Sequence, residues 1–450
     1  MSLQAVQLPI TDSFVELFRR CKDEPMALFL DSCDHTAGQW DFIFRQPKQV
    51  VTASLQWPEV LESALNSLPV YQGPSHLPFH GGLAGAWSYD AGRALETIPA
   101  IAQADITLPE LCVGLYTQAL MRNRKTGETW LLAPTEELEA LQTFWLTQPD
   151  SKPQPTTFEL LTTWQSNMSA VEYADKFAQV QTYLRAGDCY QINLAQRFSS
   201  LYAGDTWNAY ELLRKNNNAP FSAFMQLEHG SLLSLSPERF LAINEHGNVE
   251  TKPIKGTRPR ATDSKQDQQL AAELQSSPKD RAENVMIVDL LRNDLSRLCI
   301  PGSVNVPKLF AIESYPAVHH LVSTVTGKLT STDHNIQLFA ACFPGGSITG
   351  APKIRAMEII DELEPHRRSF YCGSFGYFSQ HGRVDTSIAI RTLVATRSER
   401  LQNVQQGTIH CWAGGGLVAD SDCASEYQET FDKVARIIPV LTQQFGARQS

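Results

Sequence analysis

Extended segments follow one another in pairs along much of this chain, and helices separate the pairs. Residues 371–378 and 384–395 are typical of a β-hairpin that turns at His381-Gly382. Residues 169–186 place apolar side chains at helical spacing and stop at Gly187, a residue that suits a helix C-terminus. Because strands that are neighbours in sequence favour antiparallel pairing, this order predicts an α+β or mixed α/β fold with much antiparallel sheet.

Three prolines punctuate the polar stretch 148–157, which is typical of a linker. This linker would separate a β-rich amino-terminal part, residues 1–157, from a glycine- and motif-rich part, residues 158–450. Within the second part, residues 249–255 are predicted to form one strand and residues 425–445 one final helix.

The composition excludes several classes of protein. The chain of 450 residues has a net charge of −10 and no block of lysine and arginine, which argues against a nucleic-acid-binding surface. No run approaches the roughly 18 apolar residues of a membrane span, and residues 1–16 show no secretory signal. The nine cysteines are scattered without a CxxC pair, which fits reduced thiols, so we expect a cytoplasmic protein.

Lys255 lies in the run Lys252–Arg260, where an extended stretch meets Gly256. A lysine that acts as a nucleophile needs a lowered pKa and a dry, fixed setting. The neighbouring glycine lets backbone or ligand approach closely. The alternative is an ordinary solvated lysine at a strand end, and this segment alone does not decide between the two.

Two predicted helices carry pairs of carboxylates three residues apart, Asp280 with Glu283 and Glu426 with Glu429. This spacing puts both members of a pair on one helix face. One carboxylate from each helix would suit Mg²⁺, which takes hard oxygen ligands and keeps waters in its remaining positions. The alternative is that acidic residues near a helix start simply favour the helix dipole.

Further segments favour an anionic ligand. A glycine-rich loop over residues 343–353, which contains Ser347, precedes a helix, so its amides are suited to an anion. Arg391 is predicted to lie in a strand with small neighbours on its face, which leaves space for a ligand carboxylate. The triple glycine at 414–416 offers another approach lined by backbone. The alternatives are tight turns and a structural ion pair of the arginine.

Glu238 follows a strand end, and it would serve as a general acid if burial raised its pKa. The alternative is an ion pair with Arg239 or a solvated loop. His320 is a candidate for a hydrogen bond from a neutral imidazole. No third ligand stands at zinc spacing, so the sequence predicts no zinc site.

Together these segments resemble the chorismate-utilising enzymes, and within them the large subunits (component I) of the aminodeoxychorismate synthases. The resemblance covers about residues 165–440 strongly and the amino-terminal third less sharply. It implies the fold of anthranilate synthase component I, with an antiparallel β-sandwich core flanked by helices. The motifs that carry it are Gly187–Asn193, Ser234–Phe240, Pro253–Arg260, Asp280–Asn284, His320–Ser323, Gly345–Lys353, Gly373–Tyr377, Ala389–Thr392, Ala413–Gly416 and Glu426–Glu429.

The resemblance also implies roles for individual residues. Glu283 and Glu429 would hold Mg²⁺, with Asp280 and Glu426 in support, and the metal would hold one carboxylate of chorismate. The other carboxylate and the rest of the substrate would fall to Arg391, Tyr371, His320, Ser347 and the backbone of Gly414, Gly415 and Gly416.

Lys255 separates the branches of this family. The similar run in anthranilate synthases is PIAGT, with alanine in place of lysine, whereas the aminodeoxychorismate synthases have lysine as here. The resemblance thus implies that Lys255 attacks C2 of chorismate while Glu238 protonates the departing C4 hydroxyl, before ammonia adds at C4. The product would be 4-amino-4-deoxychorismate, on the route to para-aminobenzoate and folate, in a transaminase-class amination.

Three alternatives remain. One is anthranilate synthase component I, which Lys255 disfavours. Another is a lysine that acts as a base for water attack at C2, as in isochorismate or salicylate synthases. The third is a non-catalytic subunit that binds tryptophan.

The family implies two further partners. Ammonia normally comes from glutamine through a separate amidotransferase subunit, component II, and this chain has no amidotransferase-like nucleophile segment. Related enzymes also bind tryptophan in the amino-terminal sandwich, where this chain has Gln39 at the position of the family's arginine. The matching positions are Ser32, Ala37, Gly38, Gln39, Trp40, Pro220, Phe221 and Ser222.

Overall fold

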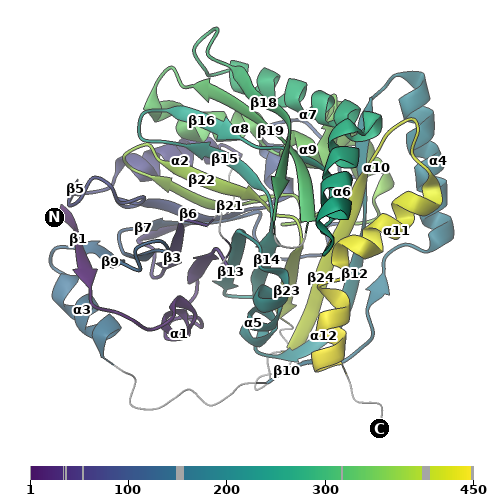
Figure 1. Ribbon diagram of the computed structural model, residues 1–450. Helices are drawn as coiled ribbons and strands as arrows, with labels where there is room; N and C mark the ends of the chain where they lie inside the picture. The colour runs from purple at the N-terminus through teal and green to yellow at the C-terminus, as the bar shows by residue number, and fades with distance from the viewer. Residues whose placement is uncertain are drawn as a thin grey trace.

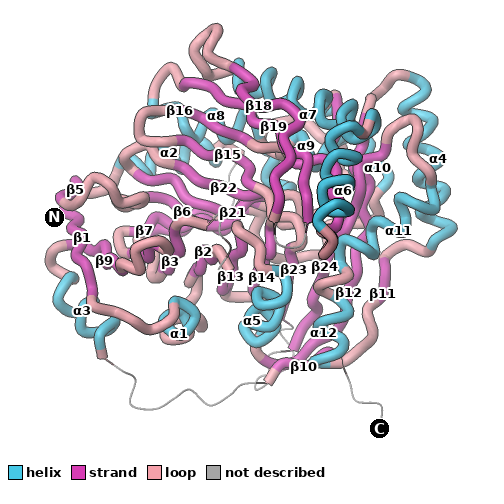
Figure 2. The backbone as a smooth tube through the Cα atoms, in the orientation of Figure 1, coloured by secondary structure: helices cyan, strands magenta, loops and turns pink. Residues whose placement is uncertain are grey.

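Two large β-sheets form the centre of the computed structural model, and helices lie around them (Figures 1 and 2). The structure describes residues 2–33, 35, 38–52, 55–147, 157–315, 318–397 and 406–446. Pairing between strands is antiparallel throughout the named sheets except between β1 and β5. The mixed α/β class predicted from the sequence is confirmed.

The first sheet has 14 strands and the second has 10. In spatial order the first sheet contains β10 (Phe158–Leu160), β12 (Gln191–Gly204), β24 (Gln406–Leu417), β23 (Thr392–Arg397), β14 (Gly230–Ser236), β13 (Phe221–Leu227), β2 (Leu28–Asp31), β3 (Trp40–Phe44), β8 (Ala119–Asn123), β9 (Thr129–Pro134), β1 (Ser2–Leu8) and β5 (Val70–Gln72), while β11 (Gln165–Ser166) and β20 (Gly350–Ala351) pair with β12. The second contains β17 (Ile254–Pro259), β19 (Val318–Lys328), β16 (Asn248–Thr251), β15 (Arg239–Ile243), β22 (Val384–Ile388), β21 (Ser374–Ser379), β6 (Gly82–Trp87), β7 (Leu111–Tyr116) and β4 (Gln49–Val51), while β18 (Asn305–Ser314) pairs with β19.

The helices cover the sheets in groups. They are α1 (Phe14–Phe18), α2 (Trp57–Asn66), α3 (Leu138–Leu146), α4 (Ala170–Ala186), α5 (Thr206–Asn217), α6 (Ser264–Ser276), α7 (Pro278–Ser296), α8 (Asn335–Cys342), α9 (Gly346–Thr349), α10 (Lys353–Leu363), α11 (Cys423–Val434) and α12 (Ile438–Phe445), with short 3₁₀ turns at Tyr89–Ala94 and Thr332–His334. The largest apolar core joins residues of both sheets with those of α2, α7 and α8. A second core lies between the first sheet and α1, α3, α5 and α12.

Local sequence signals set several boundaries. Ser169 caps α4 through a reciprocal capping box with Glu172, and Gly187 ends the helix in the left-handed conformation with φ of 80°. The hydroxyl of Ser277 accepts a hydrogen bond from the backbone N–H of Asp280, so Ser277 caps α7. These predicted helix ends are confirmed.

Other predicted elements are divided in the structure. Residues 384–395 form two strands in different sheets, because the chain crosses from β22 to β23 at residues 389–391. Residues 249–255 are likewise shared between β16 and β17, which both pair with β19 on either side of Pro253. The final helix is broken into α11 and α12, where Pro439 occupies the first turn of α12. The predictions of one strand over residues 384–395, one strand over residues 249–255 and one helix over residues 425–445 were therefore wrong.

Both sheets take strands from both parts of the chain: β1, β2 and β3 share the first sheet with β12 and β24. The stretch 148–156 of the predicted linker lies outside the described residues, and the domain boundary at residue 157 stays a prediction. All nine cysteines are free thiols. Among the helices of the described residues, none combines the length and the apolar character that a membrane crossing requires.

Two glycines face each other where β6 pairs with β21, Gly85 and Gly376. A Cβ atom on Gly85 would stand 2.1 Å from the carbonyl oxygen of Cys112, which is backbone and has little room to move. We predict that Gly85→Ala lowers the free energy of unfolding by at least about 2 kcal/mol, because the strand must shift to relieve the clash. Urea denaturation measures the loss.

The matched control is Gly127→Ala, since a Cβ atom there meets nothing within 4 Å although φ is +76°. This variant should lose only about 1 kcal/mol, from the unfavourable backbone conformation. Equal losses in the two variants would show that the close packing of β6 is not the cause.

Candidate active site

One cavity of about 680 Å³ collects every residue to which the sequence assigned catalysis, substrate binding or metal binding. Its walls come from strands of both sheets and from α7, α9 and α11. The predicted residues that line it are Glu238, Lys255, Glu283, His320, Ser347, Tyr371, Arg391, Gly414, Gly415, Gly416 and Glu429. Residues that are far apart in sequence thus form one site.

A β-bulge in β17 directs Lys255 into the cavity. Lys255 lies opposite Leu321 and Thr257 lies opposite His320, so Gly256 is the extra residue of the bulge. Gly256 has φ of +74°, and a Cβ atom there would stand 2.6 Å from Oδ1 of Asp280. Glycine is therefore required at this position both by the backbone conformation and by the approach of α7.

The amine of Lys255 is unpaired. It makes no hydrogen bond or ion pair with any residue that the structure describes. Burial lowers the pKa of Lys255, and the charge of Lys433 lowers it further, against the opposing effect of Glu283 and Glu238. Because the neutral amine is the nucleophilic form, this setting favours attack on an electrophile.

Glu238 is a buried carboxyl group in the same cavity. The residue is only 6% exposed, in the turn between β14 and β15, and its Oε1 accepts a hydrogen bond of 3.1 Å from the Ser347 hydroxyl. Burial raises the pKa of Glu238 to about 7, although Lys255 and Ser347 oppose the shift. A carboxyl group that keeps its proton near neutral pH is suited to general acid catalysis.

Arg391 is an unpaired cation in the wall of the cavity. It lies in the crossover between β22 and β23 with φ of +51°, so the predicted alternation along a strand was wrong. Its guanidinium has no hydrogen-bond or ion-pair partner among the described residues. Burial lowers the pKa of Arg391. A desolvated guanidinium without a protein carboxylate is suited to a ligand carboxylate.

Aromatic and imidazole groups complete this end of the cavity. Tyr371 is 3% exposed and its ring is parallel to that of Trp412, with 6.2 Å between ring centroids. Burial, followed by the charge of Arg391, lowers the pKa of His320 to about 4, so its imidazole is neutral at pH 7. Nδ1 of His320 lies 2.9 Å from the hydroxyl of Thr257.

The glycines of β24 allow close approach of other groups. A Cβ atom on Gly416 would stand 2.3 Å from Nε2 of Gln191 and 3.4 Å from Nζ of Lys255. A Cβ atom on Gly415 would stand 3.0 Å from Oε2 of Glu426. Side chains at these positions would therefore occupy space between the amine and the carboxylates.

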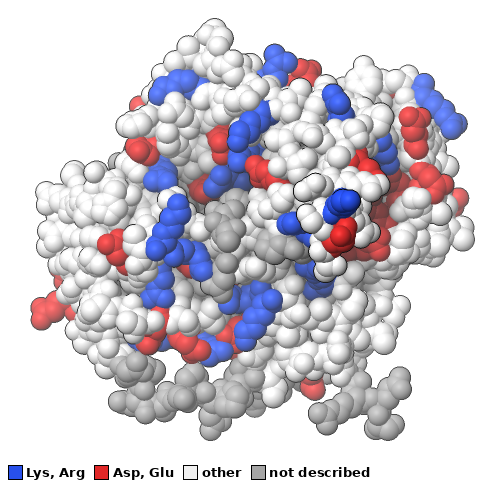
Figure 3. Space-filling view, in the orientation of Figure 1, with Lys and Arg blue, Asp and Glu red and all other residues white. Residues whose placement is uncertain are grey.

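Carboxylates from two helices face the cavity, Asp280 and Glu283 from α7 and Glu426 and Glu429 from α11. Burial raises the pKa of Glu283, and the nearby charges of Glu426 and Asp280 raise it further. Glu429 also bonds to Lys433, with 2.6 Å between Nζ and Oε1. In the space-filling view, acidic side chains gather in a recess beside α11 (Figure 3).

This donor set fits Mg²⁺. All four groups supply hard oxygen atoms, and the repulsion among them is the charge that a divalent cation would neutralise. Within the described ranges no three histidine, cysteine, aspartate or glutamate side chains are close enough together to hold a metal ion. Two protein carboxylates would leave several positions to waters and ligand oxygens, as is usual for Mg²⁺.

Sequence reasoning missed several residues of this cavity. Lys433 lines it and donates a hydrogen bond of 2.7 Å to the Gly414 carbonyl. The signal was present, because Lys433 is four residues after Glu429 and so lies on the same helix face. Asn193 and Trp412 also line the cavity. They belong to the paired strands β12 and β24, and only the pairing reveals their place.

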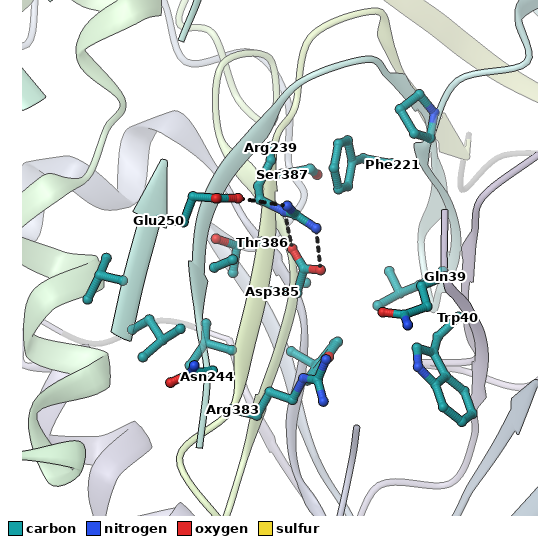
Figure 4. Close-up of a pocket in the computed structure, with 18 of the residues that line it drawn as sticks. Gln39, Trp40, Phe221, Arg239, Asn244, Glu250, Arg383, Asp385, Thr386 and Ser387 are labelled. Atoms are coloured by element: carbon teal, nitrogen blue, oxygen red, sulfur yellow. Dashed lines mark hydrogen bonds and ion pairs between the residues drawn. The ribbon is translucent and has the colours of Figure 1, made fainter. Parts of the chain in front are cut away.

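The residues expected to bind tryptophan line a second cavity of about 630 Å³. Ser32, Gly38, Gln39, Trp40, Pro220, Phe221 and Ser222 all contribute to it, while Ala37 lies outside the described residues. Figure 4 shows Arg239 between Glu250 and Asp385, with Gln39 and Trp40 on the other side. Nε of Arg239 lies 2.9 Å from Oδ1 of Asp385.

Comparisons with known proteins agree with this geometry. A family model described as chorismate binding enzyme matches residues 27–439. The aminodeoxychorismate synthase component 1 of Salmonella typhimurium is 49% identical over 433 residues, covering 92% of each chain. That of Escherichia coli is 48% identical over 445 residues, covering 94% of this chain and 95% of the other. Anthranilate synthase component I from Streptococcus pneumoniae is structurally similar, with a TM-score of 0.75 and 27% identity, covering 90% of this chain and 93% of the other.

The lowered pKa of Lys255 can be tested by chemical labelling of its amine. The neutral fraction of an ordinary lysine falls about tenfold for each pH unit below its pKa, so carbamylation by cyanate slows steeply as the pH falls. We predict that carbamylation of Lys255, followed by mass spectrometry, slows less steeply between about pH 9 and about pH 7 because its pKa is lowered.

Lys353 is the internal control, because it is also largely buried but donates hydrogen bonds of 2.7 Å to Asp294 and to the Cys342 carbonyl. The ratio of Lys255 to Lys353 labelling should rise toward lower pH. A constant ratio would contradict the lowered pKa.

Proposed function

Because this chain belongs to the chorismate-binding enzymes, we propose that it aminates chorismate to 4-amino-4-deoxychorismate as an aminodeoxychorismate synthase component 1. The observation that carries the proposal is the unpaired amine of Lys255 in one cavity with the buried carboxyl group of Glu238, whose pKa is raised. An anthranilate synthase would need no such amine, and a non-catalytic subunit would need neither group.

The cavity supports a division of the substrate between two ends. Chorismate is a dianion, and Arg391 would bind one carboxylate beside Tyr371. His320 and Ser347 would line the ring, and the backbone of Gly414, Gly415 and Gly416 leaves room for it. The second carboxylate would lie toward the acidic end, near α7 and α11.

Two displacements then follow from the positions of Lys255 and Glu238. The neutral amine of Lys255 forms a bond to C2, the two conjugated ring double bonds both shift, and the C4 hydroxyl leaves as water with the proton of Glu238. Ammonia next forms a bond to C4, both double bonds shift back, and the bond between C2 and Lys255 breaks, which returns the neutral amine. The proton lost by the new ammonium group restores the acid form of Glu238.

Glu283 and Glu429 would hold Mg²⁺, with Asp280 and Glu426 in support. When bound, the cation would neutralise the acidic end of the cavity and hold the second carboxylate of chorismate. The cavity carboxylates repel one another without it, so we expect activity to require the metal.

The ammonia would come from a separate glutamine amidotransferase, component II, since the relatives named above are the first component of their enzymes. The reaction would be a transaminase-class amination of chorismate. Its product would be a precursor of para-aminobenzoate and folate. The nine free thiols favour a cytoplasmic location.

A second ligand is supported by the other cavity, for which we propose tryptophan. Phe221 and Trp40 offer aromatic surfaces to an indole. Arg239 is already paired with Asp385 and Glu250, whereas Arg383 also lines the cavity and is available for an amino acid carboxylate. Gln39 offers an amide where the family has a guanidinium, so we expect weaker binding than in relatives that keep the arginine.

We predict that Lys255→Ala lowers ammonia-dependent formation of 4-amino-4-deoxychorismate by at least about 1,000-fold, because it removes the nucleophile. The assay uses the purified chain with chorismate, ammonium and MgCl₂, and detects product by chromatography and mass spectrometry. Lys252→Ala is the matched control, since Lys252 lies three residues before Lys255 but pairs with Glu313 at 3.2 Å and does not line the cavity. Full activity of Lys255→Ala would refute the nucleophile, and fluorescent anthranilate from the wild type would refute the branch.

We predict that tryptophan binds in isothermal titration calorimetry and that Phe221→Ala weakens binding by about tenfold through loss of ring contact. Lys255→Ala should bind tryptophan as the wild type does, because it lies in the other cavity. Absence of binding to the wild type would remove the proposal for this cavity without affecting the proposal for the first.

A further inference from the structure

Glu364 and Arg368 form an ion pair in the interior, next to the wall of the Lys255 cavity. Their side chains are 4% and 1% exposed. Nε of Arg368 donates to Oε2 of Glu364 at 2.9 Å, and a terminal nitrogen donates to Oε1 at 2.6 Å. Oε1 also accepts a hydrogen bond of 2.9 Å from the backbone of Ala195 in β12. The pair is therefore fixed to the first sheet.

The remaining donors of Arg368 hold two backbone carbonyls of the cavity wall. One terminal nitrogen donates to the Ile348 carbonyl at 2.9 Å, and the other donates to the Asn193 carbonyl at 2.6 Å. The side chain of Asn193 also donates to the Ile348 carbonyl, at 2.8 Å. Both Ile348 and Asn193 line the cavity. One guanidinium thus ties α9 to β12.

This connection reaches Glu238 through one hydroxyl. Ile348 directly follows Ser347, whose hydroxyl donates to Oε1 of Glu238 at 3.1 Å. The helix α9 has four residues and no side-chain cap, so its own hydrogen bonds hold it weakly. The position of Ser347 consequently depends on the bonds to the Ile348 carbonyl.

We propose that the Glu364–Arg368 ion pair positions Ser347 against Glu238 and so acts on the general acid without touching substrate. A buried ion pair is weak evidence for stability, because well-packed apolar residues often replace one without loss. Here two of the four hydrogen bonds of Arg368 hold backbone carbonyls of the cavity wall, and one of these carbonyls, that of Ile348, adjoins Ser347. This inference rests on the proposed role of Glu238 as the acid.

The proposal predicts the direction in which the pH dependence of turnover shifts. Lys255, Lys433 and Ser347 favour the ionised form of Glu238, which also interacts with Arg391. Loss of the Ser347 hydrogen bond would raise the pKa of Glu238 further. Because the acid works protonated, turnover falls as the pH rises through this pKa, and a higher pKa moves that fall to higher pH.

The test measures kcat for ammonia-dependent turnover against pH in Ser347→Ala, Arg368→Lys and the double variant. Lysine keeps the charge but cannot supply four hydrogen bonds at once. We expect Arg368→Lys to lower kcat at pH 7.5 about tenfold and to move the alkaline limb upward as Ser347→Ala does. The double variant should show no further shift, since both changes remove one interaction.

Two further variants separate positioning from folding. Arg45→Lys changes another buried arginine pair, in which Nε of Arg45 lies 3.0 Å from Oε2 of Glu24, and it should leave the pH profile unchanged. The double change Glu364→Leu with Arg368→Leu removes the charges and the carbonyl bonds together. It should lower the thermal transition, because the backbone N–H of Ala195 and the carbonyl of Asn193 lose bonds to these side chains, and it should still show the shifted limb.

Several outcomes would overturn the inference. One is an alkaline limb of the kcat profile that shifts in Ser347→Ala but not in Arg368→Lys. Another is a double variant in which the two single shifts add. An Arg368→Lys protein that does not fold leaves the decision to the leucine pair, for which an unshifted limb counts against positioning. Failure of the proposed function is a different result: Lys255→Ala would then remain active, or the wild type would show no alkaline limb.

Discussion

Desolvation of two opposite charges in one cavity is the constraint on which the rest of this site depends. Burial lowers the pKa of Lys255 and raises that of Glu238, so both groups move toward their neutral forms. A direct ion pair between them would oppose both shifts and favour the charged form of each group. The structure avoids one by placing Lys255 on β17 of the second sheet and Glu238 in the turn between the sheets, with Ser347 as the partner of the carboxyl group.

Arg239 in the second cavity and Arg391 in the first differ in whether a protein carboxylate pairs with them. Arg239 in the second cavity is already neutralised by Asp385 and Glu250, whereas Arg391 in the first has no partner among the described residues. A ligand carboxylate therefore gains more at Arg391, where it does not compete with a protein carboxylate. This contrast favours a ligand carboxylate at Arg391 rather than at Arg239, and it leaves Arg383 as the arginine for a ligand carboxylate in the second cavity.

The sequence predicted the parts of the fold that depend on local chemistry. The caps of α4 and α7 followed from Ser169, Gly187 and Ser277, and the family motifs identified every residue expected in the cavity. It did not predict Arg391 outside a strand, because a continuous run of strand-forming residues does not reveal a crossover between sheets. The i,i+4 spacing of Glu364 and Arg368 was a visible signal for their ion pair, but the bonds of Arg368 to the Ile348 and Asn193 carbonyls have no signature in sequence.

The pairing of β12 with β24 has a consequence for how the chain reaches this structure. β12 ends at Gly204 and β24 begins at Gln406, yet the two strands pair from Ile192 with Leu417 to Ala203 with Gln406. Contacts between residues so distant in sequence must wait for most of the chain, and they slow folding. On the ribosome, β12 would emerge long before its neighbour and expose an unpaired edge. Asn193 of β12 and Trp412 of β24 both line the cavity, so the cavity cannot be complete before these strands pair.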